Sequence, residues 1–200
     1  MSDSTPLAGP QSVLDFWFGE PGSAEVGQRR PRWFQKSDAF DAEIRTCFGA
    51  TIEAALDGAC DAWTAADAPL SHHVAYIVVL DQFTRNVYRD CARMVAGDAR
   101  ALTAAGALVA RGDDRRLPAL QRWFCYLPFE HAEDLVIQNR SLALFADLAR
   151  EPGMEDVFEW ARKHQVIVAR FGRFPHRNRL LGRTSTPEET VFLAGPDSSF

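Results

Sequence analysis

The sequence predicts an all-α protein, on three observations. Apolar residues recur every three or four positions along most of the chain. Signals for helix starts and stops divide these runs, and the connections between them are short. Alternating strand patterns are absent, and the only β-branched run lies at 76–80. We therefore expect roughly seven to nine helices, in a single domain over residues 1–200.

The first helices are predicted from spacing and from their end signals. Apolar residues four positions apart, from Phe40 to Leu56, mark one face of a helix. Residues 71–88 form a second helix whose middle is apolar all round, as in a helix buried on every side. A third begins at Asp98 as its cap and ends at Gly112.

Proline and capping signals place the later helices. Pro118 and Pro128 suit the first turns of two helices, and the second of these is expected to run to about Arg150. A helix over 154–171 follows a Pro-Gly break. The stretch TPEE, residues 186–189, has the pattern of a capping box with proline at the first helical position.

Composition limits the classes of partner. The formal net charge of −5 argues against nucleic-acid binding. The longest strongly apolar stretch, 74–80, is too short to span a bilayer, and the N-terminal stretch 1–11 has no signal-peptide pattern. We therefore expect a cytoplasmic protein that binds neither membrane nor nucleic acid. The four cysteines form no C-x-x-C pair, so no metal or cofactor is expected. The oligomeric state stays open.

A first polar cluster lies in LDQFTRN. Asp81 and Arg85 share one strip of the predicted helix 71–88, with Gln82 beside them and Asn86 next in sequence. Charged groups at the tip of a buried helix need partners. The cluster is therefore either a ligand contact or an internal Asp81–Arg85 pair that holds helix ends together.

A second polar cluster lies in LPFEHAEDLVIQNR. On a helix starting near Pro128, His131, Asp134 and Gln138 fall on one face, with Glu130 beside them. A histidine followed three residues later by a carboxylate can be an oriented base, a structural pair or two metal ligands.

Other residues near these clusters are expected to have ordinary roles. Glu133 and Arg140 are predicted to point together into solvent. His164 lies on an apolar face, where a histidine is usually a core residue with its hydrogen bonds satisfied. His72 and His73 open a helix and are interpreted as incidental.

The stretch 170–183 contains five arginines and no acidic residue. A nucleic-acid strip does not suit an acidic chain, and a purely solvated run does not explain the interleaved phenylalanines and leucines. We interpret the stretch as the cationic wall of a site. Its members are Arg173, His176, Arg177 and Asn178. The predicted acidic wall is Asp81, Glu130 and Asp134.

Six spaced motifs resemble those of a bacterial family called domain of unknown function 924. They are VLDFWFGE (13–20), RWF (32–34), LDQFTRN (80–86), LPFEHAED (127–134), RFGRFPHRN (170–178) and LGRTSTPEE (181–189). The resemblance covers about residues 12–193. It implies an array of antiparallel helix pairs, similar to the right-handed superhelix of tetratricopeptide-like proteins. Thr84 stands where the family usually has proline, and Ala132 where it usually has serine.

Three functions remain open. In the first, which we favour because tetratricopeptide-like arrays are mostly interaction scaffolds, a polar groove binds an anionic small molecule or a peptide carboxylate. In the second, a hydrolase-type enzyme uses His131 or His176 as general base, oriented by Asp134 or Asp81. Arg173 or Arg177 would stabilise the developing negative charge. In the third, the motifs only hold the fold together.

Overall fold

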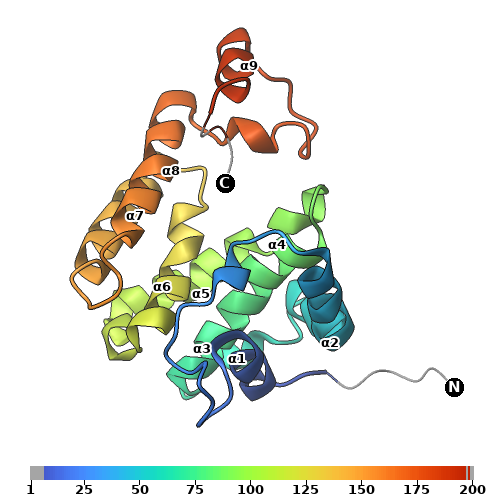
Figure 1. Ribbon diagram of the computed structural model, residues 1–200, viewed down its shortest axis with the longest axis vertical. Helices are drawn as coiled ribbons and strands as arrows, with labels where there is room; N and C mark the ends of the chain where they lie inside the picture. The colour runs from blue at the N-terminus through green and yellow to red at the C-terminus, as the bar shows by residue number, and fades with distance from the viewer. Residues whose placement is uncertain (1–6, 197, 199–200) are drawn as a thin grey trace, which may run out of the picture. The chain divides into compact units, whose positions relative to one another are not determined.

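The structure is a computed structural model that describes residues 7–196 and 198. Within these residues the chain is helical and contains no strand, which confirms the all-α prediction (Figure 1). Residues 1–6, part of the stretch considered for a targeting signal, lie outside the described residues. The helices are α1 (Pro10–Phe18), α2 (Asp38–Leu56), α3 (Leu70–Ile77), α4 (Thr84–Val87), α5 (Asp98–Arg111), α6 (Ala119–Glu130), α7 (Leu135–Leu148), α8 (Val157–Phe171) and α9 (Pro187–Leu193).

The chain divides into two compact units. The N-terminal unit extends to Pro128, except for the short segment Asp90–Ala92. That segment belongs with Phe129 and the residues after it, which form the C-terminal unit. The prediction of a single domain over the whole chain stays a prediction.

Aromatic side chains form the core of the N-terminal unit. The Trp17 ring stacks on Phe40 at 5.9 Å between centroids and meets Phe124 edge-on at 5.5 Å. Trp33 donates from Nε1 to the Trp17 carbonyl at 3.0 Å. Each such ring pair adds about 0.5–1.5 kcal/mol beyond area burial. The motifs VLDFWFGE and RWF therefore supply core residues of this unit.

The predicted helices of the N-terminal unit form, with changes at their ends. Ser37 caps α2, and the apolar stripe that starts at Phe40 is buried from Phe40 to Ile52. The helix expected over 71–88 is a continuous helical run, but its middle, Val78–Phe83, is a π-helix between α3 and α4. α3 begins one residue before Ser71, after Pro69.

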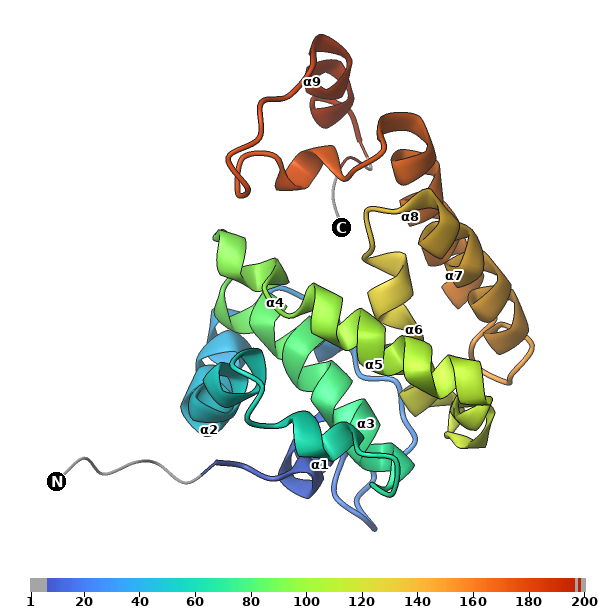
Figure 2. The ribbon, with the colours of Figure 1, turned by 180° about the vertical axis from the view of Figure 1, so that it is seen from behind.

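The π-helical segment packs closely against the start of α5. Thr84, at the family's usual proline position, donates its hydroxyl to the Leu80 carbonyl at 2.8 Å. Gly97 precedes α5, so Asp98 is the first helical residue rather than the cap. At the other end, Gly112 is left-handed with φ 73°, as predicted for a C-terminal glycine. α3 and α5 lie side by side (Figure 2).

The predicted helix from Pro128 to about Arg150 is wrong. Pro128 lies in the last turn of α6, which ends at Glu130, and α7 starts only at Leu135. Proline in a helix removes one backbone hydrogen bond. The neighbours of Pro128, Leu127 and Phe129, are buried. Their packing offsets the stability lost with the missing hydrogen bond.

The C-terminal unit contains α7, α8 and α9. α7 and α8 lie side by side (Figures 1 and 2), and Gly172 in left-handed conformation ends α8. The predicted capping box of α9 is confirmed: Thr186 Oγ1 accepts from Glu189 N at 3.1 Å, and Glu189 Oε2 accepts from Thr186 N at 2.8 Å.

Candidate functional site

The first polar cluster connects helices of the N-terminal unit. Asp81 is fully buried and accepts from the Gln82 amide at 2.7 Å, and its Oδ1 lies 3.3 Å from Arg85 Nη1. Arg85 also forms a fork with both carboxylate oxygens of Asp98, at 2.8 and 3.0 Å. Asn86 donates to Asp41 at 2.8 Å. These contacts link α4 to α2 and α5, which favours the internal-pair interpretation of this cluster.

Electrostatics agree with that interpretation. Although burial acts to lower the pKa of Arg85, the nearby carboxylates of Asp81 and Asp98 raise it overall, so the guanidinium stays charged. The Arg85 guanidinium, 16% exposed and flanked by two carboxylates, belongs to an ionic triad in which each charge has a counter-charge.

The second cluster is arranged differently from the sequence prediction, because residues 131–134 connect two helices. Asp134 is exposed and caps α7, accepting from Val136 N at 2.8 Å and from Ile137 N at 3.0 Å. Gln138 is buried and donates to the carbonyls of Glu130 and Ala132, at 2.6 and 2.8 Å. His131 and Asp134 therefore do not share a helix face.

Replacing Asp134 with alanine is expected to cost about 1 kcal/mol of stability, because two amide groups at the start of α7 lose their acceptor. Urea unfolding followed by circular dichroism measures this. Asp134→Asn, which can still cap, is expected to lie close to the parent. A loss of anion or substrate binding in Asp134→Ala without any loss of stability would give Asp134 a site role instead.

Glu133 was predicted to be solvated, and this is wrong. Its carboxylate forms a fork with Arg183, at 2.5 and 2.9 Å, and accepts from Phe174 N at 2.7 Å. Burial alone would raise the pKa of Glu133, but the bonds from Arg183 and Phe174 lower it overall. Glu133 therefore fastens the stretch 170–183 to the segment before α7.

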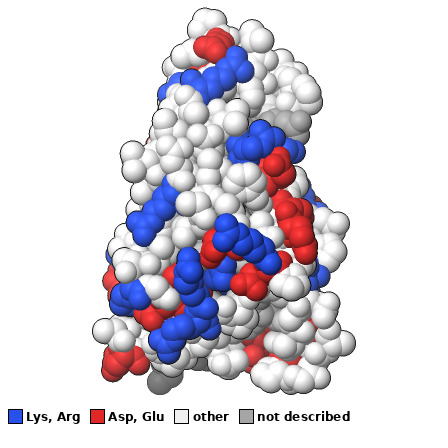
Figure 3. All heavy atoms as spheres, turned by 90° about the vertical axis from the view of Figure 1, so that its left-hand side faces the viewer, with Lys and Arg blue, Asp and Glu red and all other residues white. Residues whose placement is uncertain are grey.

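The arginine-rich stretch is largely neutralised within the C-terminal unit. Arg173 forms a fork with Glu189, at 2.6 and 2.8 Å, and Arg170 pairs with Glu188. Asn178 donates to Ser185 and to Glu189, at 3.1 and 3.2 Å. On the face drawn in Figure 3, basic side chains likewise lie next to acidic ones. Arg173 and Asn178 therefore have structural contacts of their own.

Three histidines and a buried carboxylate gather around Phe174; we call them, with Arg177, the histidine cluster. Its members are Glu130, His131, His164, His176 and Arg177. The His164 ring lies 6.0 Å from His131 and 5.6 Å from Phe174, and the Phe174 ring lies 5.5 Å from His176. His164 is buried, as predicted for a core histidine.

A carboxylate orients one imidazole of the histidine cluster. His164 Nδ1 lies 3.0 Å from Glu130 Oε1 and 2.9 Å from the Trp160 carbonyl. Because both neighbours are acceptors, Nδ1 carries the proton and Nε2 is the basic atom. Glu130 is 3% exposed, and its other oxygen has no hydrogen-bond partner among the residues that the structure describes.

Arg177 contributes a positive charge to the histidine cluster. Its guanidinium is buried and lies 4.7 Å from the centre of the Phe174 ring. Burial, followed by the positive charge of Arg177, lowers the pKa of His176 to about 4. His176 is therefore uncharged at neutral pH.

Similarity to other proteins agrees with the motifs. A model of bacterial proteins of unknown function (DUF924) matches residues 13–197. The chain belongs to this family. A solved structure of a protein of unknown function from Agrobacterium tumefaciens is 35% identical, with 92% of this chain and 96% of that chain covered and a TM-score of 0.78. No curated protein matches the chain.

In this member of the DUF924 family, the predicted site residues lie in both units. Asp81, Gln82, Arg85 and Asn86 belong to the N-terminal unit, and the other candidates, from Glu130 to Asn178, belong to the C-terminal unit. Within the C-terminal unit the structure brings His131 and His176 to the same cluster and places Asp134 at a helix cap. The prediction of one site built from all of them stays a prediction.

Neither a metal-binding group of side chains nor a membrane-spanning helix is present among the described residues. No three or more histidine, cysteine, aspartate or glutamate side chains are grouped so that they can hold a metal ion. No helix in residues 7–196 has the length and apolar character needed to cross a membrane.

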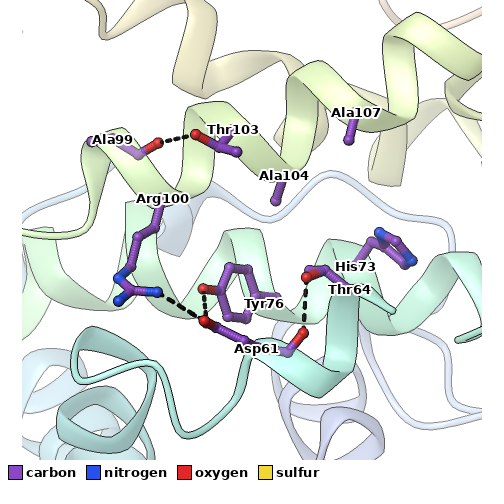
Figure 4. A pocket seen from close by; sticks show the side chains of 9 residues that line it. All are labelled: Asp61, Thr64, His73, Tyr76, Ala99, Arg100, Thr103, Ala104 and Ala107. Carbon is purple, nitrogen blue, oxygen red and sulfur yellow. Dashed lines mark hydrogen bonds and ion pairs between the residues drawn. The ribbon is translucent and has the colours of Figure 1, made fainter. Parts of the chain in front are cut away.

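Sequence reasoning missed a cavity in the N-terminal unit of this DUF924 protein. It is a pocket of about 360 Å³, open to solvent, between α3, α5 and the short helix Asp61–Thr64 (Figure 4). His73, interpreted from the sequence as incidental, lines it together with Tyr76 and Arg100. The sequence contains only a weak signal for this pocket. Several alanines on one helix predict that the helix forms, and they do not directly predict an unfilled volume beside it.

Proposed function

We propose that this protein binds a small anion, a carboxylate or a phosphate, at the histidine cluster of its C-terminal unit. The observation that carries the proposal is the buried guanidinium of Arg177 beside His176. The planar fork of an arginine side chain suits carboxylate and phosphate oxygens. Burial, and after it the charge of Arg177, lowers the pKa of His176, so its imidazole is a neutral hydrogen-bonding group beside the guanidinium.

The proposal is narrower than the one from sequence. Arg173 and Arg183 already form forks with Glu189 and Glu133, so a ligand would have to displace a carboxylate to reach them. Arg177 lies over the Phe174 ring and beside His176, whose uncharged imidazole can hydrogen-bond to a ligand, and the charge of Arg177 also helps to lower the pKa of Glu133. The site we propose therefore combines Arg177 with His131 and His176. A peptide C-terminus presents the same carboxylate chemistry as a small molecule.

The proposal also includes an arrangement of the helices, suggested by the family resemblance, and a cellular location, suggested by the composition. We propose a tetratricopeptide-like arrangement of helix pairs, and the adjacent α7 and α8 support it as one such pair. Within that arrangement the protein acts as a binding scaffold in the cytoplasm. The absence of a helix able to cross a membrane, among the described residues, is compatible with this location.

Phosphate, sulfate or acetate at low ionic strength is expected to raise the melting midpoint of the parent protein, and added sodium chloride is expected to reduce the effect. Arg177→Gln is expected to weaken anion affinity at least about tenfold. Arg179→Gln removes an exposed charge from the same stretch and serves as the matched control, with an expected change below about twofold.

The proposal fails if no anion shifts the midpoint at millimolar concentration, or if Arg179→Gln weakens binding as much as Arg177→Gln. Because Arg177 is buried, its replacement by glutamine can disturb folding. Arg177→Lys keeps the charge and loses the fork, so it is expected to fold and still to bind less tightly.

An esterase or phosphatase is the second candidate, and the Glu130–His164 contact at 3.0 Å favours it. A carboxylate that holds an imidazole with Nε2 as the basic atom is the arrangement of a general base. Adding p-nitrophenyl phosphate or p-nitrophenyl acetate and following both binding and nitrophenolate release separates the two candidates. Release of nitrophenolate by the parent, lost in His164→Gln, would identify an enzyme. Binding without release would identify a binding protein.

A further inference from the structure

An aromatic ring lies exposed on the surface of the N-terminal unit. Phe34, the last residue of the RWF motif, is 56% exposed although its side chain is large and apolar. Single exposed apolar residues are common on protein surfaces, so this exposure alone indicates no function. Two further features distinguish Phe34, namely the rings that support it and the charges on either side of it.

Three buried rings support Phe34 from below. The Phe34 ring is parallel to the ring of Phe124, with 6.2 Å between centroids, and tilted against Trp123 at 5.1 Å. It meets Trp33 edge-on at 6.4 Å. Each of the three supporting side chains is at most 5% exposed. Phe34 is therefore fixed against the core on one side and open to solvent on the other.

The segment before Phe34 is anchored by hydrogen bonds to α1. Arg30 is buried, and its Nη1 donates to the carbonyls of Phe16 and Trp17, at 2.8 and 2.9 Å. The Trp33 indole donates to the same Trp17 carbonyl at 3.0 Å. A surface that is already ordered loses little conformational freedom when a partner binds. The structure thus presents the Phe34 ring in a preorganised position.

Positive charge is concentrated in the same segment. Residues 26–37 contain four Lys or Arg side chains and no Asp or Glu, in a chain whose formal net charge is −5. Two of the four have internal partners. Arg30 pairs with Glu25 at 2.9 Å, and Arg32 pairs with Glu43 at 2.9 Å. These two cations hold the segment in place.

The other two cations, Arg29 and Lys36, are exposed. The Arg29 guanidinium lies 4.5 Å from the centre of the Trp123 ring, which is the ring that Phe34 also contacts. A guanidinium over a ring keeps its N–H donors at its edge, where carboxylate oxygens can reach them. Lys36 follows Phe34 by two residues. The exposed ring therefore has a cation on each side of it in the sequence.

This combination favours one class of partner. A nucleic-acid strand is held mainly through its phosphates and needs a longer series of cations than two side chains. A membrane surface contact depends on a larger apolar area than one ring provides. A short acidic peptide segment needs only one apolar contact and a few carboxylates within the Debye length, which is about 8 Å at physiological ionic strength.

We propose that the surface formed by Arg29, Phe34, Lys36 and Trp123, here called the Phe34 surface, binds an extended acidic segment of another protein. A large apolar side chain of that segment packs on the open side of the Phe34 ring, and carboxylates beside it pair with Arg29 and Lys36. Aromatic and arginine side chains often dominate the binding energy of interfaces. The Phe34 surface belongs to the N-terminal unit and shares no residue with the histidine cluster, so it is independent of the proposed anion site.

Synthetic peptides test the class of partner. Fluorescence anisotropy with the full chain compares a labelled peptide of glutamates around one tryptophan with two relatives. In one relative serine replaces the tryptophan, and in the other glutamines replace the glutamates. All are acetylated and amidated, so that no terminal carboxylate can bind at the anion site.

The glutamate–tryptophan peptide is expected to bind with a dissociation constant below about 1 mM, and each relative at least about fivefold more weakly. The proposal is overturned if this peptide does not bind at millimolar concentration, or if either relative binds as tightly. Oligothymidylate and vesicles of phosphatidylcholine with phosphatidylglycerol are then added to the complex. Displacement of the peptide by either one, more effectively than by unlabelled peptide, would overturn the proposal in favour of that partner.

A charge reversal tests the place of binding. Lys36→Glu is expected to weaken binding of the glutamate–tryptophan peptide about fivefold, because repulsion replaces attraction. Arg179→Glu makes the same change of charge at an exposed position of the C-terminal unit, with an expected change below about twofold. Equal effects of the two variants would place the peptide elsewhere. Lys36→Glu is also expected to leave the phosphate-induced rise in melting midpoint unchanged, so the two proposed sites can fail separately.

Phe34→Ser tests the apolar contact. The variant is expected to lose most of the affinity that the tryptophan adds, and to bind the serine peptide as the parent does. Val191→Ser removes an apolar side chain that is 75% exposed on α9 and is expected to keep the full preference for tryptophan. An undiminished preference in Phe34→Ser would overturn the contact. Circular dichroism checks that this variant is folded, and the result for Lys36→Glu does not depend on it.

Discussion

Gly97→Ala is expected to lower the free energy of unfolding by about 3 kcal/mol, because a β-carbon at this position has no room. Placed on the backbone of Gly97, it would lie 2.2 Å from the Leu80 carbonyl oxygen and 2.9 Å from Leu80 Cβ. The φ of −90° is open to any residue, so the cost is steric. Leu80 cannot move away easily, since it is fully buried and its carbonyl accepts from Thr84.

Gly106→Ala is the matched control for this prediction. Gly106 lies inside α5, the helix that Gly97 precedes, and a β-carbon at Gly106 meets nothing within 4 Å. Alanine is expected to stabilise the protein by about 0.5–1 kcal/mol at this position, through its higher helix propensity. Urea unfolding of both variants measures the difference. Similar stabilities for the two variants would show that α5 does not approach the π-helical segment this closely.

The close approach at Gly97 also matters for the cavity. It fixes the start of α5 against the helical run that begins with α3, and these two elements carry opposite sides of the cavity. Arg100 lies three residues after Gly97, within the first turn of α5. A displacement of that turn would therefore change the position of the Asp61–Arg100 pair relative to His73.

Helix periodicity was predictable because it depends on local physics. The stripe from Phe40 to Ile52 is buried as expected, since every fourth residue of a helix lies on the same face. The capping box at Thr186 and Glu189 forms because its partners are three residues apart. Features whose interacting residues lie within one helical turn can thus be predicted from a single sequence.

The error at Pro128 shows how one local rule can hide another. Proline is common in the first turn of a helix, and that preference led to a predicted helix start. The structure places Pro128 in the last turn of α6. A competing signal was present, because Asp134 directly precedes an apolar helical run, as a cap does. The wrong boundary then produced a false shared face for His131 and Asp134.

Most of the candidate site could not be predicted, because its contacts join residues that are distant in sequence. Glu133 lies 50 positions from Arg183 and 41 from Phe174, so its residue type alone suggested a solvated charge. His164 approaches Glu130 only because α8 packs against the segment after α6. The cavity depends on Asp61 and Arg100, which are 39 positions apart. The positions of charged residues are visible in the sequence, whereas their partners depend on the fold.

Glu189 shows how the arginine-rich stretch contributes to stability. Its carboxylate accepts from Arg173, from Asn178 and from the Thr186 backbone. Four donors around one side chain that is 2% exposed make it the most connected carboxylate that we describe in the C-terminal unit. The neighbouring Glu188 pairs with Arg170 on the surface, where both side chains are more than half exposed.

Glu189→Gln is expected to destabilise the protein by about 2 kcal/mol at neutral pH, since the charged acceptor of Arg173 is lost while the size of the side chain is kept. Glu188→Gln removes an exposed pair and is expected to cost below about 0.5 kcal/mol.

The bonds from Arg173 lower the pKa of Glu189 from 4.5 to about 2. A group with a lowered pKa stabilises the fold above its unfolded pKa and loses this contribution as pH falls. The difference between parent and Glu189→Gln is therefore expected to be constant above pH 5 and to shrink between about pH 4.5 and pH 2. Urea unfolding across this range measures it. A difference that does not change with pH, or an equal effect of the two variants, would show that the ionised Glu189 carboxylate does not hold the arginine-rich stretch in place.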